Sequence, residues 1–141
     1  ALKELDIKDT IKSIQDEIKK LDLQDVLDKT VRNLNGGHRR RVEILRALIN
    51  KPKLLLLDEA TVGLDLKSRF DILDYVKELV KTKNISVLWI THLFDEVNEN
   101  DDISIIKDGE IIESGVAKDI VKKHNKENLV DTFSELTKVV K

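Results

Sequence analysis

The chain has 141 residues, a length that fits one domain or part of one. Charged residues make up 37% of it and hydrophobic residues 40%, the balance of a globular protein. Its longest apolar stretches, Leu54–Leu57 and Val87–Ile90, have four residues, whereas a membrane-spanning helix needs about 20. The absence of cysteine excludes disulfides and thiolate metal sites. A net charge of −2 disfavours a basic nucleic-acid-binding protein, so we expect no nucleic-acid partner.

Residues 1–30 are predicted to be helical. Apolar residues recur there at spacings of four and three, which places them along one side of a helix. Asp9 or Thr10 is a candidate N-cap, and a short second helix is expected around Gln24–Asp28. The apolar stripe consists of Ile7, Ile11, Ile14, Ile18 and Leu21.

A second long helix is predicted over residues 36–49. It ends at Lys51-Pro52, because a residue before proline avoids helical backbone angles. The apolar run that follows, which ends in the acids Asp58 and Glu59, predicts a buried strand of a parallel sheet. The inner side of the helix is expected to carry Val42, Leu45, Leu48 and Ile49.

A further helix over about 67–82 and a second buried strand over Ile85–Ile90 come next. Helices alternating with short apolar strands indicate an α/β fold with a parallel sheet. The inward positions of this helix are predicted to be Leu66, Phe70, Leu73, Val76 and Val80.

The last third of the chain predicts a hairpin and a helical tail. Ile103–Lys107 and Glu110–Glu113 are joined by Asp108-Gly109, a dipeptide that favours a two-residue hairpin turn. Residues 116–141 are charged and are expected to be helical, with a boundary near Gly115.

Two acids close the first apolar run, and ligands of open α/β sheets bind at the carboxyl ends of strands. Neighbouring strand residues point to opposite faces, so one acid is suited to hold a metal and the other to orient a water. A solvated strand end is the favoured explanation of an isolated acidic pair, and His92 by itself is more often structural than catalytic.

Asn35-Gly36-Gly37 opens the second helix. Glycine is a poor helix former, so two in a first turn suggest close approach by a ligand at the anion-binding end of the helix. A plain turn capped by Asn35 is the simpler alternative. The three arginines that follow, Arg39–Arg41, indicate either a site for planar multi-donor side chains or a solvated helix face.

Together and in this order, these segments resemble the ATP-binding cassette (ABC) ATPases over about residues 20–115. Leu34–His38 resembles the signature motif, usually Leu-Ser-Gly-Gly-Gln. Leu54–Asp58 resembles the Walker B strand, with Glu59 at the catalytic glutamate position. Val62–Asp65 resembles the D-loop, and Thr91-His92 resembles the switch-histidine loop.

The resemblance implies an α/β fold that combines part of a RecA-like P-loop NTPase core, with parallel strands and flanking helices, and part of the ABC helical subdomain. It divides the chain into residues 1–35 of the helical subdomain, residues 36–115 of the C-terminal part of the ATPase core, and a helical tail over 116–141.

It also implies ATP and Mg²⁺ as cofactors and a role for each motif residue. Asp58 helps to hold Mg²⁺, Glu59 acts as general base, and His92 contacts the γ-phosphate. The signature residues contact the nucleotide bound by a partner subunit, and Asp65 communicates across that dimer. The signature residues carried over are Asn35, Gly36, Gly37 and His38, with asparagine and histidine in place of the usual serine and glutamine.

The expected function is an ATP-binding and ATP-hydrolysing subunit that energises a membrane exporter. The expected partners are a second nucleotide-binding subunit, head to tail, and a separate transmembrane permease, at the cytoplasmic face of the membrane. Trp89–Val97 and Arg39–Glu43 are most similar to the ABC-2 export type and, within it, to the pyrroloquinoline-quinone-associated group. The alternatives are an ABC protein outside transport and a truncated or regulatory module without enzymatic activity.

The main departure from the family pattern is that no Gly-x-x-x-x-Gly-Lys-Ser/Thr loop occurs in the chain. The aromatic residue that stacks on adenine and the glutamine loop are also unidentifiable. We therefore expect the C-terminal part of a nucleotide-binding domain, which begins inside the helical subdomain and is inactive alone. Such a part has exposed sheet edges, which predict swapping or aggregation.

Overall fold

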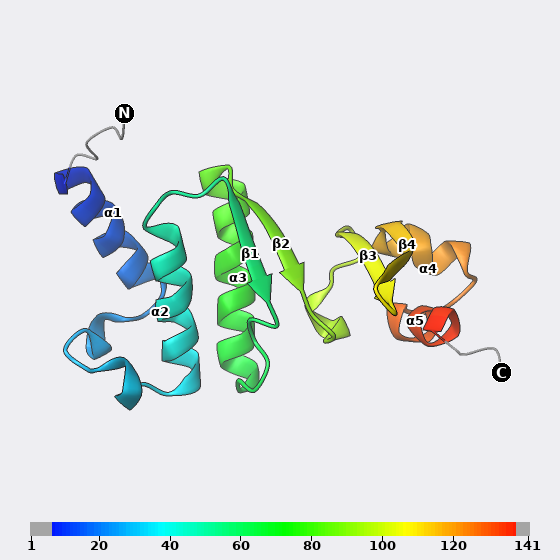
Figure 1. The fold of residues 1–141 in the computed structure, drawn as a ribbon, viewed down its shortest axis with the longest axis horizontal. Coiled ribbons are helices and arrows are strands. Elements are labelled where there is room, and N and C mark those ends of the chain that lie inside the picture. Colours follow the sequence, from blue (N-terminus) through cyan, green and yellow to red (C-terminus); the bar gives the residue numbers. More distant parts are fainter. Residues whose placement is uncertain (1–6, 138–141) are drawn as a thin grey trace. The chain divides into compact units, whose positions relative to one another are not determined.

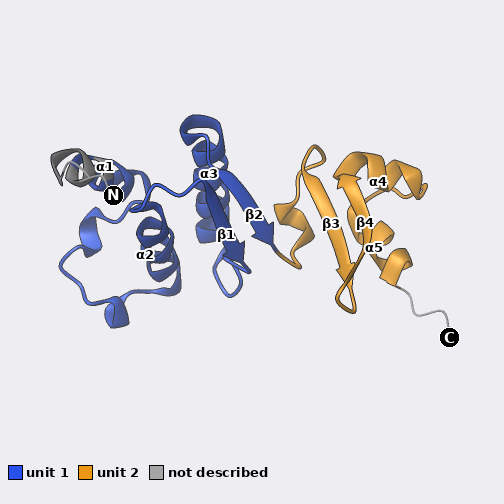
Figure 2. Ribbon diagram, turned by 45° about the horizontal axis from the view of Figure 1, so that its top comes forward, with its two compact units in different colours: residues 1–90 blue, residues 91–141 orange. Residues whose placement is uncertain are grey.

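A computed structural model describes residues 7–137 of the chain. The chain divides into two compact units, residues 1–90 and residues 91–141, which are shown in different colours in Figure 2. The predicted division at residues 35 and 115 follows family motifs rather than contacts, and it stays a prediction. Among the described residues, no helix has both the length and the apolarity to cross a membrane.

The described residues of the first unit, 7–90, form three helices, two 3₁₀ turns and two strands (Figure 1). β1 and β2 pair in parallel, with Leu54 opposite Ser86 and Asp58 opposite Ile90, as the apolar runs predict. α3 is the crossover between them. The elements are α1 (Ile7–Lys20), η1 (Gln24–Val26), η2 (Val31–Asn33), α2 (Gly36–Leu48), β1 (Leu54–Asp58), α3 (Leu66–Lys83) and β2 (Ser86–Ile90).

The two strands are buried on one face only, which corrects the predicted full burial. Leu55 and Leu57 of β1 lie in the core with α3, while the alternate residues Leu54 and Leu56 are 53% and 65% exposed. Leu88 and Ile90 of β2 are exposed as well. In the described part of the chain, helices cover only one side of this sheet. The apolar sequence of the strands is typical of a sheet covered on both sides, but here the second face is exposed to solvent.

The helices pack through faces that differ from the predicted ones. On α3 the most buried residues include Ile72 and Leu79, whereas Leu66, Phe70 and Val80 are exposed; Leu73 and Val76 are buried as predicted. Apolar residues lie around more than half of the circumference of α3. The side of α3 that packs into the core is rotated by roughly one residue position from the predicted side. On α2, Ile44 is the buried apolar residue, while Val42, Leu45 and Leu48 pack against the core; Ile49, which follows the helix, is exposed.

A buried carboxylate joins α1 to α3. Glu17 accepts hydrogen bonds from the Tyr75 hydroxyl and the Lys83 ammonium group. Burial raises the pKa of Glu17, but the hydrogen bonds from Lys83 and Tyr75 outweigh it, so the net pKa lies below its ordinary value. Burial and the Glu17 carboxylate raise the pKa of Tyr75.

The start of α1 differs from the prediction. Asp9 and Thr10 lie within α1, so neither is its N-cap. The apolar stripe is described in part: Ile18 packs against the core and Leu21 is buried. The side chains of Ile7 and Ile11 are not among those that the structure describes. The predicted short second helix is present as η1.

The second unit contains the predicted hairpin and tail. β3 (Asp102–Lys107) and β4 (Glu110–Val116) pair antiparallel around Asp108-Gly109, where both residues have positive φ, as a tight hairpin turn requires. η3 (Phe94–Glu96) precedes the hairpin, and α4 (Ala117–Lys123) and α5 (Leu129–Thr137) follow it. The Phe94 and Phe133 rings meet edge to face, with centroids 5.3 Å apart, and so join the start of this unit to α5.

We expect Leu56→Thr to leave the free energy of unfolding within about 0.5 kcal/mol and to reduce self-association, because Leu56 lies on the open sheet face and threonine suits a strand. The matched change Leu55→Thr, one residue away on the buried face, should cost about 2–4 kcal/mol. Urea unfolding and sedimentation velocity measure the two effects. Equal destabilisation by both changes would show that the face is covered in solution.

A second prediction concerns acid stability. Lys123 and His124 of the second unit donate to the Glu113 carboxylate at 2.7 and 3.0 Å and lower its pKa from 4.5 to about 2. A lowered folded-state pKa means that this stabilisation is present above about pH 4.5 and is lost as the pH falls toward 2. The melting-temperature difference between wild type and Glu113→Gln should therefore shrink over that window. Glu110→Gln on the same strand is the control, and a pH-independent difference would contradict the prediction.

Candidate functional site

Asp58 and Glu59 lie exposed at the C-terminal end of β1. Asp58 is the last strand residue, on the open face with Leu54 and Leu56. Glu59 follows the strand with φ of 46°, a left-handed backbone that is costly for a residue with a Cβ, and its N–H donates to the carbonyl of Ile90 at 2.9 Å. The predicted alternation of faces therefore does not extend to Glu59. The left-handed backbone turn, and not the strand, determines the direction of the Glu59 side chain.

The predicted signature segment begins α2. Asn35 is the N-cap: its side-chain oxygen accepts from the backbone N–H of His38 at 2.8 Å. The first N–H groups of a helix have no partner within the helix, and this cap satisfies the one at His38. The N–H groups of Gly36 and Gly37 remain at the positive end of a 13-residue helix, where an anion binds favourably. The cap and the anion site are thus compatible, although the sequence presented them as alternatives.

The packing of a neighbouring helix is one reason for the glycine at position 37. A Cβ added at Gly37 would lie 2.8 Å from the hydroxyl oxygen of Ser68 in α3. A Cβ added at Gly36 would lie 3.2 Å from the end of the Leu64 side chain. The glycines therefore permit close packing of the signature against the start of α3, a role that the sequence alone did not separate from ligand approach.

The predicted D-loop residue Asp65 caps α3. Its carboxylate accepts from the Ser68 N–H at 3.0 Å and from the Ser68 hydroxyl at 2.7 Å. These hydrogen bonds hold the pKa of Asp65 below its ordinary value. Ser68 thus contacts both predicted motifs, Gly37 on one side and Asp65 on the other. Sequence reasoning missed Ser68; an aspartate N-cap three residues before a serine was the available signal.

The histidines occupy different settings. His38 is partly buried in the first turn of α2, and its contact with a nucleotide stays a prediction. His92 is exposed in the segment that follows β2 and precedes η3. His92 belongs to the second unit and Glu59 to the first, so each is described within its own unit, and the catalytic role of His92 stays a prediction.

The arginine run divides between the two predicted roles. Arg41 is buried and donates to the carbonyl of Leu21 at 3.2 Å and to the Asp71 carboxylate at 2.8 Å, so it ties α2 to the end of α1 and to α3. Arg40 pairs with Glu43 on the surface, and Arg39 is exposed. The planar multi-donor role thus applies to Arg41 and is structural.

The residues at this end of the first unit fit a magnesium–nucleotide complex. No group of three or more acidic or histidine side chains that could enclose a metal occurs in the described ranges. Mg²⁺ commonly takes only one or two carboxylates, with waters and substrate phosphates as its other ligands. Asp58, exposed at the end of β1, is a carboxylate of the kind that such a site uses, and its role as a magnesium ligand stays a prediction.

Comparisons with known proteins agree with the motifs. The ABC transporter family model matches residues 3–62, which include the signature segment and the acidic pair. ABC transporter G family member 20 of Dictyostelium discoideum is 33% identical over 132 residues, which cover 93% of this chain and 18% of that protein. The chain belongs to the ABC transporter family.

Solved structures of ABC ATPases share the fold. An ATP-binding subunit of an ABC transporter matches with a TM-score of 0.80 and 24% identity, over 96% of this chain and 57% of the subunit. An ATP-binding cassette of an ABC transporter matches with a TM-score of 0.76 and 29% identity, over 99% of this chain and 53% of the cassette. The chain therefore spans less than a fifth of the curated relative and just over half of these solved subunits.

We predict that Gly37→Ala destabilises this ABC ATPase chain by about 1–2 kcal/mol, because the Ser68 hydroxyl must leave its hydrogen bond with Asp65. In an unobstructed helix the same change stabilises by up to about 1 kcal/mol. In a Ser68→Ala background the cost should fall by at least about 1 kcal/mol. Urea unfolding of the four proteins of this double-mutant cycle tests the contact, and an equal cost in both backgrounds would refute it.

Proposed function

We propose that this chain supplies the signature, Walker B and D-loop part of an ATP-hydrolysing subunit that energises a membrane exporter. The observation that supports it most is the position of these motifs in the first unit. The C-terminal ends of β1 and β2 and the N-terminal ends of α2 and α3 lie on the same side of that unit (Figure 1). Carboxylates and an anion-binding helix start thus meet at one end, as Mg²⁺–ATP chemistry requires.

Each residue then has a defined task. Glu59 accepts a proton from the water that attacks the γ-phosphate, and its left-handed backbone sets the direction of its side chain. Asp58 helps to hold Mg²⁺, whose charge offsets that of the phosphates. Gly36 and Gly37 present their N–H groups to a phosphate of the nucleotide held by a partner subunit. His92 contacts the γ-phosphate, and Asp65 links signature and partner through Ser68.

The transport role rests on similarity to the family. The relatives are described as members or subunits of ABC transporters, and the Trp89–Val97 segment resembles the export type. We propose a head-to-tail second nucleotide-binding subunit and a separate membrane permease as partners, with the ATPase at the cytoplasmic face. The function outside transport and the regulatory role stay alternatives.

The chain alone is expected neither to hydrolyse ATP nor to bind Mg²⁺–ATP at micromolar concentration. Its sequence holds no Gly-x-x-x-x-Gly-Lys-Ser/Thr loop, whose backbone N–H groups and lysine provide most of the phosphate contacts in P-loop ATPases. Isothermal titration with Mg²⁺–ATP measures this, and micromolar binding would mean that other residues supply the phosphate site.

The test of function is ATP turnover by the natural gene product that carries this sequence. Glu59→Gln should lower kcat by about 10²–10⁴-fold and leave Mg²⁺–ATP binding in place, because the amide cannot accept the proton. Glu127→Gln, an exposed loop residue of the second unit, is the matched control and should turn over normally. A Glu59→Gln enzyme with wild-type kcat would remove the proposed base, and an inactive wild type would favour the regulatory alternative.

A further inference from the structure

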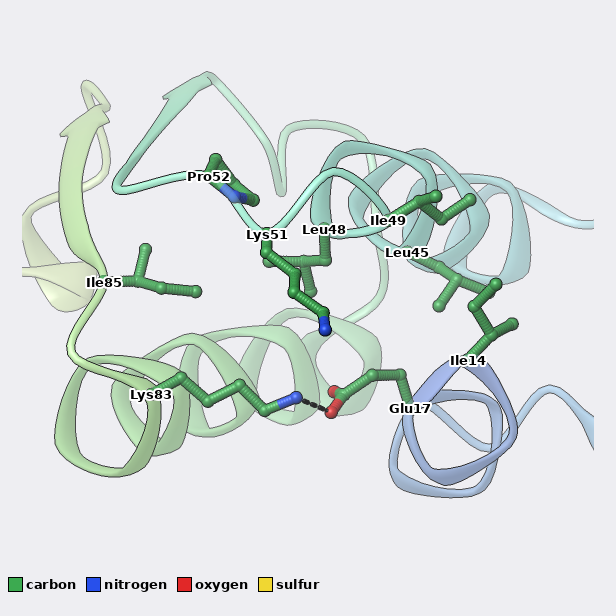
Figure 3. A pocket seen from close by; sticks show the side chains of 9 residues that line it. All are labelled: Ile14, Glu17, Leu45, Leu48, Ile49, Lys51, Pro52, Lys83 and Ile85. Atoms are coloured by element: carbon green, nitrogen blue, oxygen red, sulfur yellow. Dashed lines mark hydrogen bonds and ion pairs between the residues drawn. The ribbon is translucent and has the colours of Figure 1, made fainter. Parts of the chain in front are cut away.

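A cavity of about 310 Å³ lies in the first unit, away from the proposed nucleotide site (Figure 3). It is formed where α1, the C-terminal end of α2, the C-terminal end of α3 and the chain just before β1 and β2 meet. The proposed site lies at the opposite ends of α2, α3 and both strands (Figure 1). The cavity is lined by Ile14, Glu17, Leu45, Leu48, Ile49, Lys51, Pro52, Lys83 and Ile85.

The lining is apolar except for one cluster of charges. Six of the nine lining residues are aliphatic or proline, and the others are two lysines and one glutamate. Glu17 is nearly fully buried and is already neutralised, since Lys83 and Tyr75 bond its two oxygens. The Lys51 ammonium group forms no hydrogen bond or ion pair with residues 7–137, and Figure 3 shows the Lys51 side chain extending into the space beside Glu17 and Lys83. The lining residues therefore carry one excess positive charge next to an apolar wall.

The backbone at Lys51 favours a role for its side chain. Lys51 has φ of 48°, the left-handed region that glycine or asparagine occupies at lower cost. Its N–H donates to the carbonyl of Leu48 at 2.9 Å, which closes the last turn of α2. A cation after a helix C-terminus is favoured by the helix dipole, but that interaction does not require the ammonium group to extend into the cavity, as it does in Figure 3.

We propose that this cavity binds a small amphipathic monoanion, an aliphatic carboxylate of about eight carbons. Its carboxylate would lie between the Lys51 and Lys83 ammonium groups, and its chain would lie against Leu45, Leu48 and Ile85. A cavity of about 310 Å³ is at the small end of ligand sites and holds roughly ten heavy atoms at about 30 Å³ each. That size excludes a phospholipid, and the excess positive charge disfavours a cationic amphiphile.

The test is a titration of the ¹⁵N-labelled full chain with sodium octanoate, followed by amide chemical shifts, with octylammonium as the ligand of opposite charge. Octanoate should shift the amides of Leu48, Lys51 and Ile85 with a Kd of about 1 mM or below, and octylammonium should bind about tenfold more weakly. Lys51→Asn keeps a residue suited to the left-handed backbone and should weaken octanoate about tenfold with an unchanged melting temperature. Lys53→Asn removes the same charge two residues away, outside the cavity, and should bind normally.

Three results would overturn the proposal. The first is the absence of shifts at the cavity, and the second is shifts confined to the open sheet face around Leu56. The third is equal weakening by Lys51→Asn and Lys53→Asn, which would show that the cavity cation is not the anchor. None of these readouts involves ATP, so the outcome is independent of the proposed function.

Discussion

Parallel pairing of two successive strands is the constraint from which the first unit follows. Parallel neighbours cannot be joined by a tight turn, so the chain must return along the sheet, and α3 does so. The C-terminal ends of both strands therefore lie at one edge, and the N-terminal end of α3 lies there too. α2 runs in the same sense as α3, which adds a second helix N-terminus. The topology thus places the carboxylates and the helix N-termini at one end of the unit. The cavity, with Lys51 and Pro52 in its lining, lies at the other end.

The sequence predicted the elements of this arrangement well, because local signals define them. Pro52 ends the helix before β1, the two apolar runs become β1 and β2, and Asp108-Gly109 forms the hairpin turn. The order of the signature and Walker B motifs predicted the family, which the comparisons confirm. These signals each depend on a few adjacent residues, so they can be read without knowing which segments pack together.

What the sequence did not predict depends on packing between distant segments. Phe70 and Val80 were expected inside and are exposed, because the core uses another side of an apolar helix. Leu54 and Leu56 look like buried strand residues, but burial of the second face requires a covering layer that no local pattern specifies. The buried state of Glu17 likewise depends on Tyr75 and Lys83, which are 58 and 66 residues away.

The candidate site was predicted as a set of residues and not as a set of contacts. Asp58 and Glu59 lie where a strand end predicts, but the left-handed turn at Glu59 came from the structure. Asn35 was correctly expected as a possible cap, and Asp65 proved to cap a helix as well. Arg41 belongs to a run that suggested binding, yet its partners are Leu21 and Asp71 within the chain.

The contact of Gly37 with Ser68 also constrains how this sequence can diverge. Position 37 accepts no Cβ while position 68 carries a hydroxyl in its present rotamer, so the two positions are sterically linked although 31 residues separate them. A lineage that gains alanine at 37 would first have to lose bulk at 68, and in doing so would give up one hydrogen bond of the Asp65 cap. Substitutions at the signature and after the D-loop are therefore expected to be correlated among relatives, with the order of the two changes set by which intermediate can fold.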